Sequence, residues 1–279
     1  MEGRAKAPIS HFTFHISHFR MSILHTIVAA NAEELAAAKH AVPANELLRK
    51  IAGLPAAPGF TEALRAKKTA VIAELKSASP SKGVIREPLD CATLARELES
   101  AGAAALSVLT EPHYFHGSLE NLRIARANCS LPLLRKEFIV DEYQLLQARA
   151  AGASAVLLIA ALLDDSQLND LTASAHGLGL EVLLEAHTEG ELDRALATQA
   201  DAIGVNARDL HTFQTSLEVV KSLIRRIPQN RTPVAESALQ THEDLVELQA
   251  AGAVGFLMGE TLMRAEHPGQ QLQELLKTS

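Results

Sequence analysis

The chain has 279 residues, of which 47% are hydrophobic and 21% charged, so it can bury a large core and does not have the composition of a disordered protein. Its formal net charge of −7 argues against the basic surface that nucleic-acid-binding proteins present to phosphates. Two cysteines, Cys91 and Cys129, are too few for a disulfide framework and favour a reducing, cytoplasmic location. The longest uncharged apolar run, residues 150–163, is too short to span a bilayer, so we expect no membrane insertion.

The first twenty residues differ from the rest of the chain. They mix histidine and phenylalanine and lack the apolar segment of a secretory signal. Because Met21 opens an ordinary helical pattern, we expect residues 1–20 to be a disordered or non-native extension and residues 21–279 to form one domain. His11, His15 and His18 fall at helical spacing, but no carboxylate or cysteine accompanies them, so we expect no metal site.

Residues 31–51 have a helical pattern, which Pro43 divides in two. Leu35, Ala38, Leu47 and Leu48 supply the apolar face. The segment precedes the first predicted strand, and the pattern leaves open which end of the fold it covers.

Eight short aliphatic runs follow, with starts about 22 to 35 residues apart. Amphipathic stretches such as 89–100, 141–150, 189–198 and 242–250 stand between them. Because the runs are almost continuously apolar, they indicate parallel strands buried on both faces. The predicted strands are residues 70–75, 105–109, 131–134, 155–159, 180–184, 202–205, 232–235 and 254–258.

An Ala-Gly-Ala sequence recurs three times, around Gly102, Gly152 and Gly252, each time between a helical stretch and the next strand. Glycine after the end of a helix takes the left-handed conformation without steric cost, so these are predicted αβ loops. Eight strand–helix units predict a single (β/α)8 TIM barrel with an extra N-terminal helical segment. An open doubly wound sheet is the alternative.

Polar residues follow five of the eight predicted strands, at the edge where barrel active sites lie. Glu74 and Lys76 alternate onto one side of the first strand, and we expect them to face inward. The other positions are 135–138 after the third strand, Glu185 after the fifth, Asn206 to Asp209 after the sixth and Glu236 to Ser237 after the seventh.

These residue types suit proton transfer. Burial and nearby cations can lower the pKa of a lysine toward neutrality while a carboxylate keeps it protonated, and a glutamate on the opposite wall suits the base. No serine triad, metal-ligand cluster or dinucleotide fingerprint stands at the strand ends, and no histidine is expected at one.

The loops after the last two strands suit a phosphate, because free backbone N–H groups gather there in many barrels. Ser237 and the Gly259-Glu260-Thr261 turn occupy these loops. The Glu260 side chain should point away from the anion.

Several stretches closely resemble the indole-3-glycerol phosphate synthase family. They are residues 72–83 (IAELKSASPSKG), 107–119 (SVLTEPHYFHGSL), 134–143 (LRKEFIVDEY), 203–210 (IGVNARDL), 234–237 and 256–263. The resemblance covers essentially everything from Met21 onward.

The resemblance implies a cofactor-free reaction in tryptophan biosynthesis. In it 1-(2-carboxyphenylamino)-1-deoxyribulose 5-phosphate closes its pyrrole ring and loses carbon dioxide and water. Lys136, held by a carboxylate such as Glu74, would protonate the ketose carbonyl oxygen. Lys76 would neutralise the departing carboxylate or assist dehydration, and Glu185 would be the base. Asn206 and Glu236 would orient the hydroxyls and the lysines.

The resemblance also implies the binding residues. Phe115, Phe138, Leu157 and Leu257 would form a slot for the anthranilate ring, with plain core packing as the alternative for each. The phosphate would be held by Ser79, Ser237, Gly259 and Glu260, with Arg208 in support. The expected partner is this small phosphorylated substrate, with no nucleic acid or membrane, and the protein is expected to be a monomer or a weak homodimer.

Two departures from the family pattern concern the same region. Ala238 stands where the family usually has glycine, in a turn that favours positive φ. His113 and His116 replace lysines near the expected mouth of the site.

The competing functions are another phosphate-binding barrel enzyme, such as phosphoribosylanthranilate isomerase, and a non-catalytic paralogue that binds the ligand.

Overall fold

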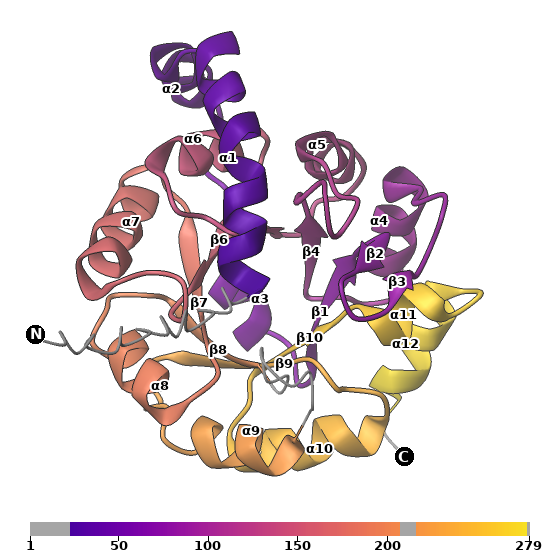
Figure 1. Ribbon diagram of the computed structural model, residues 1–279. Helices are drawn as coiled ribbons and strands as arrows, with labels where there is room; N and C mark the ends of the chain where they lie inside the picture. Colours follow the sequence, from indigo (N-terminus) through magenta and orange to yellow (C-terminus); the bar gives the residue numbers. More distant parts are fainter. Residues whose placement is uncertain (1–22, 207–215, 278–279) are drawn as a thin grey trace, which may run out of the picture.

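The computed structural model describes residues 23–206 and 216–277, which form a closed barrel of eight parallel strands (Figure 1). Strand β1 pairs with β4, its first neighbour along the chain, and also with β10, the last strand, which closes the sheet. The predicted (β/α)8 barrel is confirmed, and the open doubly wound alternative is wrong. The barrel strands are β1 (Ala70–Leu75), β4 (Ala105–Leu109), β5 (Leu133–Lys136), β6 (Ala155–Ile159), β7 (Glu181–Ala186), β8 (Ala202–Asn206), β9 (Thr232–Glu236) and β10 (Gly255–Met258).

Helices surround the barrel in Figure 1. They are α4 (Cys91–Ser100), α5 (Leu119–Asn128), α6 (Glu142–Ala150), α7 (Asp165–Gly177), α8 (Glu189–Leu196), α9 (Leu217–Ile224), α10 (His242–Ala251), α11 (Glu260–Arg264) and α12 (Pro268–Leu276). The helices α4 to α10 each follow an Asp, Ser or Thr whose side chain accepts a backbone N–H of the first turn. At the other end, Gly102, Gly152 and Gly252 have positive φ, as the Ala-Gly-Ala loops predict.

Alternation along each strand separates two apolar layers. On β1, Val71, Ala73 and Leu75 face outward and pack in the layer beneath the helices, whereas Ile72 points into the barrel. The inner layer also contains Leu134, Leu157, Leu183, Val234 and Leu257. Glu74 shares the inward side with Ile72, so its carboxylate lies at the carboxyl end of the barrel.

The amino end of the barrel is closed by α3 (Phe60–Arg65), a helix that the sequence pattern did not predict. Phe60 and Leu64 are fully buried and belong to the inner apolar layer. Glu181, the first residue of β7, accepts the backbone N–H groups of Phe60 and Thr61 at 2.5 and 2.9 Å. The carboxylate thereby satisfies free donors in the first turn of α3.

The opposite, carboxyl end is crossed by α1 (Ile23–Ala41), which is followed by α2 (Ala44–Ala52) (Figure 1). The described helix already begins at Ile23, in keeping with the helical pattern expected from Met21, and it continues into the segment predicted from residue 31. Leu24 is buried in the inner apolar layer. The Tyr143 hydroxyl lies within hydrogen-bond distance of the backbone carbonyl oxygens of Ala38 and Val42, at 2.8 and 2.7 Å, and its single O–H fixes the end of α1 against α6. The question left open by the sequence is thus answered, because α1 covers the end where the strands terminate.

Four predicted strands end too early because polar residues at their ends were assigned to loops. Lys136 lies within β5, Glu185 and Ala186 within β7, Asn206 within β8 and Glu236 within β9, all paired in the sheet. The predicted strand 131–134 also begins too early, since β5 starts at Leu133. A short antiparallel pair, β2 (Ala78–Ser79) and β3 (Gly83–Val84), follows β1 and was not predicted.

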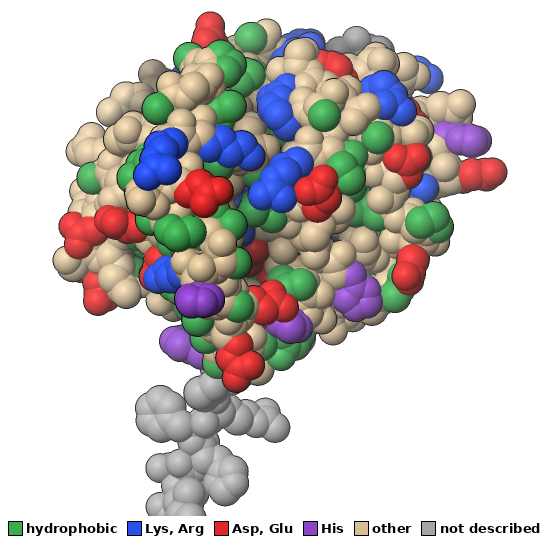
Figure 2. Space-filling model, turned by 90° about the horizontal axis from the view of Figure 1, so that it is seen from above, with side chains coloured by type: hydrophobic (Ala, Val, Ile, Leu, Met, Phe, Trp, Pro, Cys, Tyr) green, Lys and Arg blue, Asp and Glu red, His purple; other side chains and the backbone are tan. Residues whose placement is uncertain are grey.

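On the face drawn in Figure 2, acidic side chains stand among the basic ones. Among the helices described, none is both long and apolar enough to cross a bilayer.

Candidate active site

A cavity of about 970 Å³ opens at the carboxyl ends of the strands, beneath the first turns of α1. It is lined by all the predicted site residues within the described ranges: Glu74, Lys76, Ser79, Phe115, Lys136, Phe138, Leu157, Glu185, Asn206, Glu236, Ser237, Leu257, Gly259 and Glu260. Arg208 lies outside the described residues. Residues from all eight barrel strands and their loops therefore converge on one site.

Lys136 occupies the centre of the charged part of the cavity. Its Nζ lies 2.6 Å from Glu236 Oε2 and 3.1 Å from Glu185 Oε2. Glu236 comes close to β8 as well, because a Cβ on Gly204 would collide with its Oε1. The glycine on β8 thus makes room for a carboxylate on β9, and this carboxylate holds the lysine of β5.

Lys76 forms a second ion pair, with Glu74 Oε1 at 2.8 Å. The expectation that Glu74 holds Lys136 therefore needs revision, since the direct partners of Lys136 are Glu185 and Glu236. The charge of Glu74 still reaches Lys136 and contributes to raising its pKa. Gly259 approaches the second pair so closely that a Cβ there would collide with Glu74 and Lys76.

Charge and burial separate the pKa values of the two carboxylates. Burial raises the pKa of Glu236 to about 8, with a further contribution from the negative charge of Glu185. For Glu185 burial acts in the same sense, but the positive charges of Lys136 and His187 prevail and lower its pKa to about 2. Near neutral pH Glu185 is therefore ionised, as a base must be.

Lys136 is held in its charged form. Burial opposes the charge, yet Glu185, Glu236 and Glu74 outweigh it and raise the pKa of Lys136 above the ordinary lysine value. The sequence predicted opposing effects of burial and of a nearby carboxylate on such a lysine. The carboxylates prevail, because three of them surround this ammonium group.

A histidine that sequence reasoning missed lies directly behind this cluster. His187 follows the last residue of β7, and its Nε2 lies 3.3 Å from Glu185 Oε1. The expectation that no histidine stands at a strand end is therefore wrong. An acidic residue four positions on, Glu191, was the available signal, since it faces the same imidazole across the first turn of α8.

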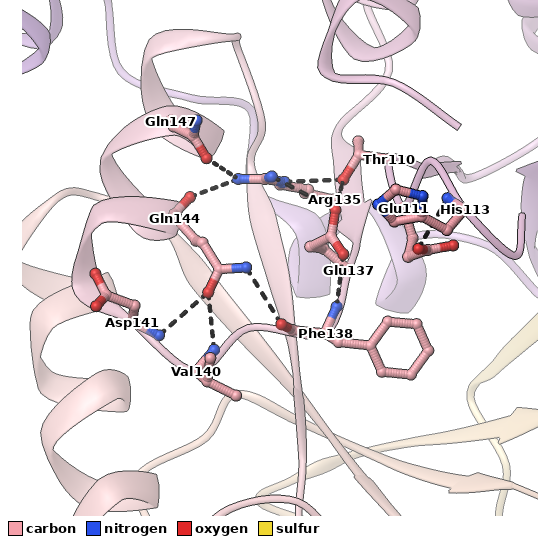
Figure 3. Close-up of polar contacts among 10 residues, drawn as sticks. All are labelled: Thr110, Glu111, His113, Arg135, Glu137, Phe138, Val140, Asp141, Gln144 and Gln147. Carbon is pink, nitrogen blue, oxygen red and sulfur yellow. Dashed lines mark hydrogen bonds and ion pairs between the residues drawn. The ribbon is translucent and has the colours of Figure 1, made fainter. Parts of the chain in front are cut away.

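The outward side of β5 is fixed by a buried polar network (Figure 3). Arg135 Nε donates to Thr110 Oγ1 at 3.0 Å, and Thr110 donates to Glu137 Oε2 at 2.5 Å. Arg135 also donates to the backbone carbonyl of Gln144 in α6, at 2.7 Å. Residues 135 and 137 are thus turned away from the barrel axis, so that Lys136 between them points into it.

Two loops place the aromatic side chains, and Figure 3 shows the polar groups that hold them. Gln144 Nε2 donates to the carbonyl of Phe138 at 3.2 Å. The Glu111 carboxylate accepts the backbone N–H groups of residues 113, 114 and 115, which shapes the loop that carries Phe115. The Phe115 and Phe138 rings lie 5.9 Å apart at an angle of 38°, which places one wall of an apolar slot.

The other end of the cavity is polar. Ser79 Oγ is buried and has no hydrogen-bond partner among the described residues. Lys82 and Arg264, two cations that the sequence analysis did not select, also line the cavity. The Glu260 carboxylate pairs with Arg264 at 3.0 Å and lies 3.9 Å from Lys82.

The residues that depart from the family pattern, Ala238 and the two histidines, lie in different surroundings. Ser237 and Ala238 both adopt left-handed backbone angles, with φ of 67° and 59°, so the alanine occupies a conformation that favours glycine. His113 pairs with Glu34 of α1 at 3.3 Å, and neither His113 nor His116 lines the cavity.

A closed barrel with two lysines paired to buried carboxylates at its carboxyl end has the site of a barrel enzyme that catalyses acid–base chemistry. A family model, "Indole-3-glycerol phosphate synthase", matches residues 24–275. Two proteins named indole-3-glycerol phosphate synthase, from Burkholderia ambifaria strains AMMD and MC40-6, are each 47% identical over 257 residues, or 91% of this chain and 98% of theirs. The chain belongs to the indole-3-glycerol phosphate synthase family and is a carboxy-lyase of tryptophan biosynthesis.

Solved structures share the architecture at low identity. A thiamine phosphate pyrophosphorylase from Pyrococcus furiosus is 16% identical with a TM-score of 0.56, covering 76% of this chain and 95% of that chain. A structure titled "Native KDPGal structure" is 20% identical with a TM-score of 0.52, covering 75% and 94%. Likeness at these identities shows the barrel fold alone.

Proposed function

We propose that this cavity converts 1-(2-carboxyphenylamino)-1-deoxyribulose 5-phosphate into indole-3-glycerol phosphate, carbon dioxide and water. The observation that carries the assignment of roles is the position of Lys136, charged and held between Glu185 and Glu236 in the cavity. An ammonium group at this place can donate to a ketone oxygen without leaving its carboxylate partners unpaired, since it has three donors.

Ring closure begins at Lys136. The ketose carbonyl oxygen accepts a hydrogen bond and then the proton from its ammonium group, while the aromatic carbon that bears the carboxylate attacks the carbonyl carbon. The new carbon–carbon bond removes aromaticity from the ring. Loss of carbon dioxide then returns the electron pair of the broken bond to the ring.

Dehydration completes the pyrrole ring. The hydroxyl formed at the former carbonyl carbon leaves as water, and Glu185, ionised at neutral pH, accepts the proton released as the ring becomes aromatic. Lys76 neutralises the departing carboxylate or supplies the proton to the leaving hydroxyl. Asn206 and Glu236 orient the ribulose hydroxyls and the ammonium groups at the cavity wall.

The two ends of the substrate fit the two ends of the cavity. The benzene ring lies in the slot of Phe115, Phe138, Leu157 and Leu257, since these apolar side chains line one part of the cavity. The phosphate lies against Ser79, Ser237, Gly259 and the backbone of Glu260, near the cations Lys82 and Arg264. Arg208 belongs to this proposal on the resemblance alone.

The alternative enzyme, a phosphoribosylanthranilate isomerase, needs one acid and one base. That function does not account for the second lysine–carboxylate pair. A non-catalytic paralogue has no use for a base with a lowered pKa beside a charged lysine.

For the location and the oligomeric state of the protein, we propose a cytoplasmic monomer or weak homodimer. Light scattering coupled to gel filtration tests the oligomeric state, because a concentration-independent dimer would contradict it.

The test of the assignment is indole fluorescence during turnover, comparing the parent chain with Lys136→Ala. The chain has no tryptophan, so the background is low. Lys221→Ala is the matched control, because this lysine also pairs with two carboxylates, Glu218 at 2.8 Å and Glu247 at 2.6 Å, but does not line the cavity. We expect loss of product signal with Lys136→Ala alone. Full turnover by folded Lys136→Ala would contradict the role.

A further inference from the structure

His187 lies between two carboxylates on the side of Glu185 that faces away from the cavity. Its Nε2 is 3.3 Å from Glu185 Oε1, and its Nδ1 is 3.3 Å from Glu191 Oε2. Glu191 Oε2 also accepts the backbone N–H of His187 at 2.8 Å. The imidazole is buried, and it does not line the cavity. His187 therefore contacts the base without being in reach of a substrate.

The arrangement suits a doubly protonated ring. A neutral imidazole carries one N–H and one lone pair, so it would direct a lone pair at one of the two carboxylates. Nε2 is buried and has no aligned hydrogen bond among the described residues, which leaves Glu185 Oε1 as its ion-pair partner. A proton on each nitrogen satisfies both contacts.

The three acidic groups near the ring favour this state. They are Glu185 of β7, Glu191 of α8 and Glu236 of β9, whereas the cation Lys136 of β5 lies beyond Glu185. Burial opposes a charge on His187, but the hydrogen bond that Glu191 accepts and the negative charges of the three carboxylates raise its pKa. The positive charge of His187 in turn lowers the pKa of Glu185.

The two oxygens of Glu185 thus have separate partners. Lys136 pairs with Glu185 Oε2 on the cavity side, and His187 pairs with Glu185 Oε1 on the outer side. Without the second cation, Glu185 would be a buried carboxylate beside another carboxylate, Glu236, and would take up a proton more readily.

We propose that His187, anchored by Glu191, is a positioning residue for Glu185: it fixes one carboxylate oxygen and supplies the positive charge that keeps the carboxylate free of a proton. The inference rests on the proposed role of Glu185 as the base. It assigns a part in the reaction to a pair of residues outside the cavity, His187 directly after β7 and Glu191 in α8.

The sign of the effect with pH follows from this arrangement. The charge on His187 is present at acidic and neutral pH and is lost as the pH rises through its raised pKa. Removal of His187 therefore raises the pKa of Glu185 and reduces the ionised base mainly at acidic pH. At alkaline pH the parent and the variant should converge.

The test measures kcat and KM from pH 5 to pH 8.5 for the parent, His187→Gln and Glu191→Gln. Glutamine can still offer a neutral N–H donor to Glu185, so this substitution removes the charge specifically. We expect the kcat of His187→Gln relative to the parent to fall as the pH is lowered from 8.5 to 5, by about two-fold or more at pH 5, because removal of this cation raises the low pKa of the buried Glu185 carboxylate toward that range. Glu191→Gln should show the same trend with about half the logarithmic change, and KM should stay within about two-fold, since neither side chain lines the cavity.

His176→Gln is the matched control, because His176 also pairs with a carboxylate, Asp201 at 2.9 Å, but does not line the cavity. It should follow the parent at every pH. The inference is overturned if the ratio of variant kcat to parent kcat stays constant across the pH range for both His187→Gln and Glu191→Gln, even if both variants are slow. A purely structural defect lowers kcat by the same factor at every pH, whereas loss of the charge lowers it most at acidic pH. The proposed function is judged separately, by turnover of the parent and its loss in Glu185→Gln. If His187→Gln does not fold, Glu191→Gln decides the inference.

Discussion

Strand β7 carries a glutamate near each end, and the two have opposite surroundings. Glu181 begins the strand, and its carboxylate is occupied by the backbone N–H groups of Phe60 and Thr61 and by the Thr61 hydroxyl. Glu185, four residues on, faces an ammonium group and an imidazole at the edge of a cavity. One carboxylate stabilises the closed end of the barrel, and the other stays available for chemistry.

The two ends of the barrel differ in the same way as these two glutamates. At the amino end, α3 fills the barrel with Phe60 and Leu64, and the Glu181 carboxylate accepts the first backbone N–H groups of this helix. At the carboxyl end, the ion pairs border a cavity of about 970 Å³. The same eight strands therefore separate stability from activity along one axis, and substitutions at the two ends should have separable effects.

The largest expected effect is that of Glu185→Gln, which removes the base and keeps the shape of the side chain. We expect kcat to fall by about 10³-fold, within the usual contribution of a positioned acid or base. Glu181→Gln is the matched substitution at the other end of the same strand. It should leave kcat within about two-fold and cost about 1–3 kcal/mol of unfolding free energy, because one acceptor is replaced by a donor. Steady-state kinetics and urea denaturation of both variants measure the contrast, and similar kcat losses in the two would contradict it.

Leu64→Ala tests the closed end directly. Leu64 is fully buried beneath the barrel strands, and truncation leaves a cavity, so we expect a loss of about 2–5 kcal/mol in the free energy of unfolding. Because the site lies at the other end, kcat measured well below the melting temperature should change little. A large fall in kcat without loss of stability would show that the two ends are coupled.

Gly259→Ala tests how closely the backbone between β10 and α11 approaches the second ion pair. A Cβ at this position would collide with Glu74 Oε1 and Lys76 Nζ, both inside the site. We expect kcat/KM to fall by roughly 10- to 100-fold, since a displacement of about 1 Å in a positioned group can cost this much. Gly177→Ala is the control, because a Cβ there meets nothing within 4 Å. Equal kcat/KM for the two variants would remove Gly259 from the site.

The sequence predicts the barrel well because its signals are local. Aliphatic runs, capping residues and the loop glycines at 102, 152 and 252 each depend on a few neighbouring residues. The predicted site residues within the described ranges also meet at one cavity, because the carboxyl ends of parallel strands share one edge of the barrel.

Pairing within the site is less predictable, because it depends on side chains from different strands. The sequence does not reveal that Lys136 pairs with Glu185 and Glu236 while Glu74 takes Lys76, since all four residues point into the same space. His187 was missed for a related reason. It follows the strand that carries Glu185, but it faces the helix layer, where Glu191 of α8 holds it.

The smallest expected effect concerns Ala238, in the loop after β9. Its φ of 59° costs an alanine about 1 kcal/mol relative to glycine, and the greater chain entropy of glycine in the unfolded state offsets part of this. We therefore expect Ala238→Gly to raise the free energy of unfolding by about 0.5 kcal/mol, as measured by urea denaturation. Since Ala238 lines the cavity beside Ser237, KM should fall by no more than about two-fold, because the backbone already has the geometry that glycine prefers. A large improvement in KM would instead mean that the alanine methyl group displaces the phosphate.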